Sequence, residues 1–433
     1  MALTEITTTR AAVAAPRRTG ARWLLLMYSM SPAAAKLMGF DALFGVGLLL
    51  LIAYFFLDAP GGNGDCEGLA VLPQFSMLAF AVYGTILGLV LVVAQVADSR
   101  AAIVGGFSFL VPVLIVGAAG PQRAARLLHD LPFVAAAQAL LALVMFSPIR
   151  LPFGPIDALS ETLLTGTAAF RLSSVGGSLA LSTTMVAAFA VAVYQHVHSP
   201  QGSPRARHTW QLSALFLVCG FLSLQRAAWL SLALIWIVAT VVARSGKRRS
   251  VGLLLGVGAL PVIAGLLFVD VPRDVIDIFI DRFDSLTGGG EVGLVAERSE
   301  QWLNVAYNLR VLPIGHGPGQ LGQPIRDSWP TTGGLPIFDG DYFRIVSEYG
   351  PAGAGFVALM LAGGVRALAN GRNHGLPGQG ISGPILAIAT VGLLVQAVGT
   401  NVSELYFANT VFWCLWIQNW TTLAPLGPQR NAC

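Results

Sequence analysis

Residues 210–243 form an apolar stretch that reads WQLSALFLVCGFLSLQRAAWLSLALIWIVATVVA. Basic residues flank it on both sides, within residues 204–208 and 244–249. Loops rich in Lys and Arg lie on the cytoplasmic side of membrane spans, so both ends are predicted to be cytoplasmic. As one helix the stretch would extend about 51 Å at roughly 1.5 Å per residue, against a hydrocarbon core of about 30 Å. It therefore predicts a hairpin of two short spans with Gln225 and Arg226 at the outer tip.

Arg226 is the charge that this hairpin places at the outer membrane boundary. A charge in that position is costly, which makes Arg226 a candidate functional residue. The alternative is a structural arginine whose side chain reaches out of the apolar layer to water. The sequence leaves both interpretations open.

The composition is that of a polytopic membrane protein. Hydrophobic residues make up 55% of the chain and charged residues 11%, against roughly a quarter charged in soluble proteins. The apolar runs are uninterrupted and lack the alternation of a β-barrel, which predicts an all-α fold of about 11–12 transmembrane helices in a single integral membrane domain, residues 1–433. Besides the two hairpin spans, the predicted spans are residues 42–57, 75–96, 101–119, 131–146, 175–195, 251–271, 351–369, 381–400 and 405–424, with a weaker twelfth at 23–38.

Basic segments also predict which loops lie outside. The N-terminal segment and residues 120–130 and 366–380 carry Arg and His, and are predicted to be cytoplasmic. Residues 147–174 and 272–350 then become external loops, and counting the crossings between the loops favours twelve spans. The longer loop, 272–350, has six arginines, no lysine and eleven carboxylates. Because its net charge is negative, anion binding there must come from individually placed arginines, whose planar guanidinium suits phosphate.

Several classes of site are not indicated. The four cysteines (Cys66, Cys219, Cys414 and Cys433) are scattered, and no Cys/His spacing predicts a metal site. The small positive charge fits cytoplasmic basic loops rather than nucleic acid, since no basic patch is interleaved with aromatics. We expect neither a cofactor nor a metal.

Four motifs carry the candidate chemistry. The first is FRLSSVGG from Phe170, with Arg171 on an external loop. The second is SLQRAAW from Ser223, at the hairpin tip. The third is ERSEQW from Glu297, with Arg298, followed by LPIGHGPG from Leu312. The fourth is FDGDYFRIVSEYGPAG from Phe338.

In order and spacing, these motifs resemble the superfamily of O-antigen ligases and Wzy-type polysaccharide polymerases, over about residues 147–369. That family has an arginine loop, a Ser-x-x-Arg-like hairpin tip and a long periplasmic loop. The loop opens with Arg and an aromatic, continues with Pro-x-x-Gly-x-Gly and closes on Glu-x-Gly-x-x-Gly. Each motif alone is weak, and the ordered set is moderately specific.

The resemblance implies a GT-C-like glycosyltransferase in the bacterial inner membrane, with its active site facing the periplasm. Its donor and acceptor would be undecaprenyl-diphosphate-linked oligosaccharides, in contact with membrane lipid, and a flippase and chain-length regulators are candidate partner proteins. Arg171, Arg226 and Arg298 would bind the diphosphate, so that no metal is needed. An acceptor hydroxyl would attack the anomeric carbon.

The motifs also suggest a base for that hydroxyl. Asp339 or Asp341 is the first choice and His316 the second. Alternatively no strong base is needed, and the rate depends on how the substrates are positioned and on departure of the diphosphate. Arg344, Glu348, Gly315 and Gly317 would support the site.

One departure from the family pattern bears on the reaction. Ligases of this superfamily typically carry a histidine at the start of the closing helix, where this chain reads Phe338-Asp339-Gly340-Asp341. This favours a polymerase of repeat units over a ligase that transfers finished polysaccharide to lipid A-core. A transporter of lipid or polysaccharide is the alternative from another class. Transporters carry ionisable residues at the membrane midplane, whereas the charges here gather in predicted loops.

Plain structural roles remain open for these residues. Arg171 could be a solvated loop residue, and Arg298 could pair with neighbouring glutamates on a helix surface. The aspartates could cap a helix N-terminus, and Arg344 and Glu348, four apart, could form an intrahelical ion pair. His316 could be a mobile loop residue, with Gly315, Gly317 and Gly319 serving a turn.

Overall fold

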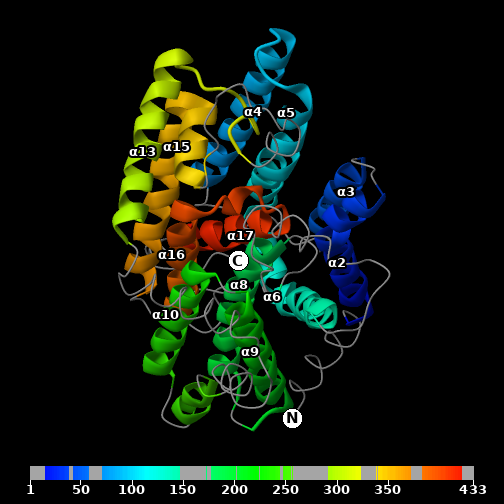
Figure 1. Ribbon diagram of the computed structural model, residues 1–433. Helices are drawn as coiled ribbons and strands as arrows, with labels where there is room; N and C mark the ends of the chain where they lie inside the picture. The colour runs from blue at the N-terminus through cyan, green and yellow to red at the C-terminus, as the bar shows by residue number, and fades with distance from the viewer. Residues whose placement is uncertain are drawn as a thin grey trace, which may run out of the picture. The chain divides into compact units, whose positions relative to one another are not determined.

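The computed structural model describes most of the chain as helices (Figure 1). All regular structure in the described residues is helical, which confirms the all-α prediction for an α-helical membrane protein. The chain divides into two compact units, Met1–Glu67 and Gly68–Cys433, and each is described by itself. The described residues are 15–38, 42–57, 71–146, 172, 177–200, 202–223, 225–243, 247–254, 256, 291–322, 338, 340–371 and 383–421.

The described residues of the first unit form two helices that pack together, α2 (Ala15–Met38) and α3 (Ala42–Phe56). The aromatic rings of Tyr28, Tyr54 and Phe55 are buried. The weak twelfth span of the sequence falls inside α2, which continues through Ser31 and Pro32. The predicted helix is therefore present, although its Pro and Ser made it the least certain of the set.

Within the described part of the chain, four helical stretches are long and apolar enough to cross a membrane. They are Leu72–Val93, Ser99–Val144, Ser178–His198 and Asp341–Ala369. Shorter apolar helices cover Gly45–Phe56, Arg226–Val242 and Pro384–Gly399. These stretches coincide with predicted spans, so the coarse prediction of a helical membrane protein holds.

The second unit begins with α4 (Val71–Val93), α5 (Ser99–Gly105), the π-helix η1 (Gly106–Leu110) and α6 (Val111–Phe146). Residues 120–130, predicted as a cytoplasmic loop, belong to helix α6 instead, and the side of the membrane on which they lie stays a prediction. A kink at Gly120, with φ 74° and ψ 175°, turns the chain there. Pro121 then starts the next helical stretch, where its missing N–H costs nothing. The basic side chains of this stretch predict a loop, but here they lie on a helix.

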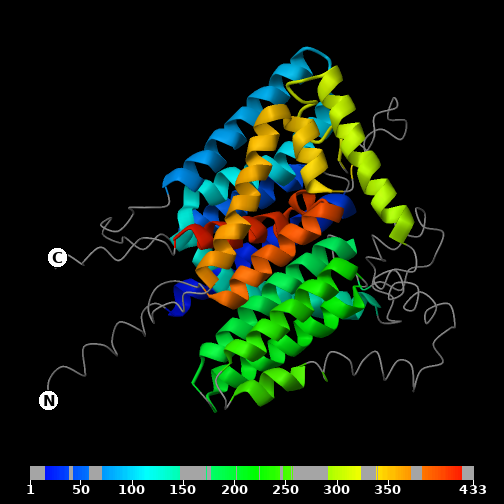
Figure 2. The same cartoon turned by 90° about the vertical axis from the view of Figure 1, so that its left-hand side faces the viewer.

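The predicted hairpin is confirmed as α9 (Pro204–Leu222) and α10 (Arg226–Val242), which pack with α8 (Gly177–His198) as one group (Figure 2). Ser203 caps α9 by accepting a hydrogen bond from the Ala206 amide at 3.1 Å. Arg226 is the first residue of α10, at the predicted tip.

The remaining elements are α13 (Glu291–Val311), α15 (Asp341–Gly371), α16 (Pro384–Gly399), the 3-10 helix η2 (Val402–Glu404) and α17 (Phe407–Thr421). The indoles of Trp413 and Trp416 lie in the core of this unit, because α17 packs against α6, α8, α15 and α16. Within α15, Gly350 has φ 60° and ψ −140° and bends the helix just before the predicted span that starts at residue 351. Most of the predicted span 251–271 lies outside the described residues.

Close packing of α15 against α17 generates a testable prediction. A Cβ at Gly363 would overlap the buried indole of Trp416, whose Nε1 donates to the Met360 carbonyl at 3.2 Å. Gly363→Ala should therefore lower the free energy of unfolding by about 1–3 kcal/mol, as overpacking does. Thermal unfolding of the detergent-solubilised protein would measure the change.

The matched control lies on the same helix. A Cβ at Gly355 would meet nothing within 4 Å. Gly355→Ala should leave stability unchanged or raise it by up to about 1 kcal/mol, because Ala is the better helix former. Equal thermal-unfolding midpoints for Gly363→Ala and Gly355→Ala would contradict the packing of α15 on α17.

Candidate functional site

The beginning of α15 carries a buried cluster of charges. Asp341, Arg344 and Glu348 lie on one face of the helix and are at most 1% exposed. The Arg344 guanidinium contacts Glu348 Oε2 at 2.6 Å and Asp341 Oδ1 at 3.2 Å. The backbone amide of Ser403 donates to Asp341 Oδ2 at 2.9 Å, and the Ser403 hydroxyl bonds to both Asp341 and Arg344. The intrahelical ion pair expected from the four-residue spacing is present, and Asp341 extends it to η2.

The same cluster holds the glycine-rich segment, residues 315–321. The second carboxylate oxygen of Glu348 accepts a hydrogen bond from the Leu321 amide at 3.1 Å. The Glu348 carbonyl accepts another from the Gly317 amide at 2.8 Å. Because Glu348 bonds both to Arg344 and to this segment, the ion pair and the segment support each other.

Glycine is required in this segment for two physical reasons. Gly315, Gly317 and Gly319 have φ of 93°, 89° and 74°, in the region that favours glycine. A Cβ at Gly315 would also overlap the Glu348 carbonyl, and one at Gly319 would overlap the Ala101 carbonyl of α5. The predicted role of the glycines in a turn is confirmed, and the close approach of neighbouring backbone adds to it.

His316 lies inside this packed segment rather than on a mobile loop. Its amide donates to the Ser347 carbonyl at 3.2 Å, and its ring is 9% exposed. One ring nitrogen hydrogen-bonds to the Asn308 backbone carbonyl, while Nε2 has no partner. Burial lowers the pKa of His316 below its ordinary value, which outweighs the raising effect of the Asn308 bond. The neutral ring that this favours donates from Nδ1 and leaves a lone pair on Nε2.

Two residues that accept hydrogen bonds from His316 through their backbone carbonyls also carry unsatisfied buried side chains. The amide nitrogen and oxygen of the Asn308 side chain on α13 and the hydroxyl of Ser347 on α15 have no hydrogen-bond partner. Buried polar groups are normally paired, so three residues that are joined by backbone hydrogen bonds and all carry unsatisfied side chains are unusual. We call Asn308, His316 and Ser347 the buried polar trio. A hydroxyl-rich ligand or ordered water could satisfy these groups.

The candidate arginines lie in different parts of the chain. Arg226 is half-buried at the N-terminus of α10, where the helix dipole favours an anion. Arg298 lies in α13, which packs against α15 (Figure 1), and the Trp302 ring of α13 contacts the Phe343 ring of α15. Arg171, Asp339 and the side chain of Arg298 lie outside the described part of the structure.

One described residue of the first motif contacts the hairpin. Leu172, next to Arg171 in the sequence, donates its amide to the Leu222 carbonyl at the end of α9, at 2.9 Å. Gln225, next to Arg226, donates to the hydroxyl of Ser178 at the start of α8, at 3.4 Å. The first two motifs are therefore brought together.

Helix α16 connects the hairpin tip to the charge cluster. Gln396 donates to Ser231, one turn beyond the start of α10, at 3.2 Å. Two residues beyond Gln396 on α16, the Val398 carbonyl packs so closely against Gly340 that a Cβ there would overlap it. The Tyr342 hydroxyl donates to the Leu394 carbonyl at 2.6 Å. The starts of α10 and α15 thus lie at the same, C-terminal end of α16.

Sequence reasoning missed several residues of this region. Asn308, Ser347, Ser403 and Gln396 are single polar residues within helical or short segments, and no spacing distinguishes them from solvated residues. These residues matter because they are buried. A sequence pattern does not predict the burial of a single polar residue. Among the described residues, no group of three or more His, Cys, Asp or Glu side chains could hold a metal ion.

Comparison of the sequence with models of known protein families and with curated proteins finds no match. The functional interpretation therefore depends on the motifs and on the contacts described above.

Removing one partner of the charge cluster should destabilise the protein. Glu348→Ala leaves a buried guanidinium with one carboxylate fewer and frees the Leu321 amide, so we expect a loss of about 3–5 kcal/mol in the free energy of unfolding. Denaturant or thermal unfolding in detergent measures it. Arg310→Ala, at an exposed position on α13, is the control and should change stability by less than about 0.5 kcal/mol. Similar losses of unfolding free energy in Glu348→Ala and Arg310→Ala would contradict a structural role for the charge cluster.

The lowered pKa of His316 predicts a pH dependence of stability. The unfolded imidazole takes up a proton near pH 6.5 and the folded one only at lower pH, so stability falls as pH drops from about 6.5 towards the folded pKa. His316→Gln should remove that part of the slope between about pH 8 and pH 5, measured by unfolding at each pH. Ser347→Ala alters the same trio without a titrating group and should keep the wild-type slope. An unchanged slope in His316→Gln would contradict the burial of a neutral ring.

Proposed function

We propose that this protein is an inner-membrane glycosyltransferase that polymerises undecaprenyl-diphosphate-linked oligosaccharide repeat units at the periplasmic face. The observation that carries the proposal is the arrangement of the motifs around α16. Segments at Leu172, Arg226 and Asp341 are far apart in sequence, yet they join through Leu222, Gln396 and Gly340 at one end of the helical unit. A site that binds a lipid-linked substrate needs such a meeting of loops at one end of the spans.

In the proposal, arginine stabilises the leaving diphosphate. Arg226 is a fixed positive charge at the N-terminal end of a helix, where the dipole adds to its effect. Arg171 and Arg298 are the further diphosphate-binding residues that the motifs suggest. The charge that develops on the departing diphosphate is then neutralised by preorganised groups.

His316 is favoured over Asp341 as the base. The two Asp341 oxygens accept hydrogen bonds from the Ser403 amide and from Arg344, which ties this carboxylate to a structural role. The Nε2 lone pair of His316 has no partner and is held in position by the Nδ1 bond to Asn308. An acceptor hydroxyl would give its proton to Nε2 while its oxygen bonds to the anomeric carbon. The bond from that carbon to the diphosphate oxygen breaks, and its electron pair leaves with the diphosphate.

A mutant strain tests the proposal. Deleting the gene from its source bacterium should leave single repeat units on the carrier lipid, which mass spectrometry of extracted lipids would detect. Long polymer accumulating on the carrier would instead indicate a ligase. An unchanged set of lipid-linked saccharides would contradict both reactions.

Complementing that strain tests the arginine. Arg226→Ala should lower polymer yield by at least about 100-fold, the usual cost of one charge-stabilising group, while membrane insertion is unchanged. Arg249→Ala removes an exposed arginine beyond the other end of α10 and serves as the control, with wild-type yield. Normal polymer from Arg226→Ala would overturn the role of this residue.

A further inference from the structure

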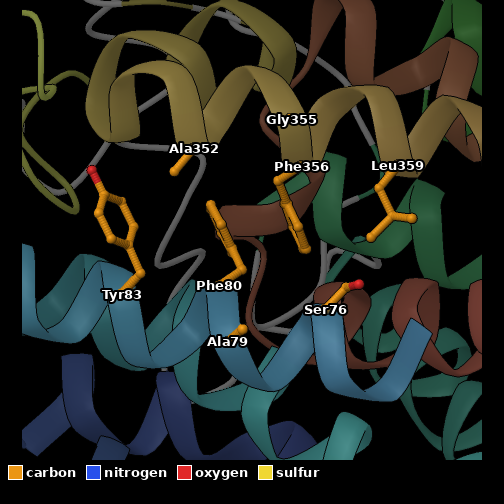
Figure 3. Close-up of a pocket in the computed structure, with 8 residues that line it drawn as sticks. All are labelled: Ser76, Ala79, Phe80, Tyr83, Ala352, Gly355, Phe356 and Leu359. Atoms are coloured by element: carbon orange, nitrogen blue, oxygen red, sulfur yellow. The ribbon is translucent and has the colours of Figure 1, made fainter. Parts of the chain in front are cut away.

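An apolar groove runs between α4 and α15 and has a volume of about 480 Å³. Its lining comes from one face of α4, from Ser76 to Tyr83, and one face of α15, from Ala352 to Leu359 (Figure 3). No charged residue is part of that lining.

Two stacked aromatic rings bridge the helices along the groove. The rings of Phe80 and Phe356 lie 3.8 Å apart between centroids with an interplanar angle of 3°. Gly355 and Ala352 next to them have little or no side chain, which leaves the space open along α15. The groove is thus formed by large rings that hold the helices together and small residues that leave room beside them.

The surface around the groove is apolar as well. Both helices belong to stretches long and apolar enough to cross a membrane. On α4, Leu72, Phe75 and Ile86 are 57–67% exposed, and on α15 Leu361 and Val365 are 46% and 69% exposed. Exposed apolar residues on membrane spans face hydrocarbon, so the groove opens to the lipid chains.

One end of the groove is polar and continues into the candidate site. The Tyr83 hydroxyl lies 3.3 Å from the Ile314 carbonyl and 3.4 Å from the Tyr349 carbonyl. Ile314 is two residues before His316, and Tyr349 is two residues after Ser347. Tyr83 therefore connects the groove to the backbone close to His316 and Ser347.

We propose that this groove binds the polyprenyl chain of the lipid-diphosphate-linked substrate, with the diphosphate end beyond Tyr83. The inference rests on the proposed function and adds a chain-binding site to it. A lipid with a charged headgroup finds no charged partner in the lining, so its head must be held past the polar end. That end leads to the glycine-rich segment and α15, which favours the substrate lipid over a bulk phospholipid.

Photo-crosslinking of the full chain in phospholipid nanodiscs tests the occupant. Leu359 lines the groove, whereas Val241 on α10 is 70% exposed and is not part of the lining, so each is replaced in turn by benzoylphenylalanine. With undecaprenyl diphosphate added, position 359 should capture mainly the polyprenyl lipid. Excess phosphatidylglycerol should not lower that capture. Position 241 should capture phospholipid. The same phospholipid fraction at both positions would overturn the proposal.

Filling the groove gives a second, kinetic test. Gly355→Leu adds a side chain where a Cβ meets nothing within 4 Å, so the helix should still form. KM for a substrate with the full undecaprenyl chain should rise at least about tenfold, while KM for a short-chain analogue with the same sugar should not change. Gly252→Leu, also at an open position, is the control and should leave both values at wild type. An equal change for both chain lengths in Gly355→Leu would count against the groove.

The outcomes separate this inference from the proposed function. Selective capture of undecaprenyl diphosphate at position 359, in a protein whose deletion leaves all lipid-linked saccharides unchanged, supports the groove and contradicts the polymerase. Polymerisation that needs Arg226, together with unselective capture at position 359, supports the polymerase and contradicts the groove.

Discussion

The buried interaction of Arg344 with Asp341 and Glu348 is the constraint on which the second unit depends. A fully buried guanidinium must be paired, and Arg344 bonds to carboxylates of α15 and to the Ser403 hydroxyl of η2 and lies over the Phe109 ring of η1. Glu348 in turn holds the Leu321 amide, so the glycine-rich segment takes its path from the same cluster. Charges that would be destabilising alone thus fix three separate segments relative to one another.

Backbone contact at glycines completes this arrangement. Gly315 approaches the Glu348 carbonyl, and Gly340 approaches the Val398 carbonyl at the end of α16. Side chains would hold these segments farther apart, and the bonds of His316 to Ser347 and Asn308 would then be lost. Helix α15 carries Ser347 of the buried polar trio before its bend at Gly350 and one wall of the apolar groove after it, which places polar and hydrocarbon environments on one continuous element.

Much of the secondary structure follows from local patterns. The hairpin of α9 and α10 could be predicted because its length exceeds one span and basic segments flank it, and the turn at Gly315–Gly319 because few other residues adopt positive φ. The loop predicted at residues 120–130 was wrong. Arg123 and Arg126 are compatible with a helix as well as with a loop, and the kink at Gly120 makes the turn that a loop would have made.

The amino-acid sequence alone is enough to specify an all-helical membrane protein, because hydropathy acts over each span independently of the others. It also marks Arg226, His316, Asp341, Arg344 and Glu348 as residues of interest. Their roles depend on tertiary contacts. Asp341, a candidate base, is buried and accepts hydrogen bonds from Ser403 and Arg344. The buried Nε2 of His316 has no hydrogen-bond partner. Burial and pairing arise between segments far apart in the chain, and no local pattern contains them.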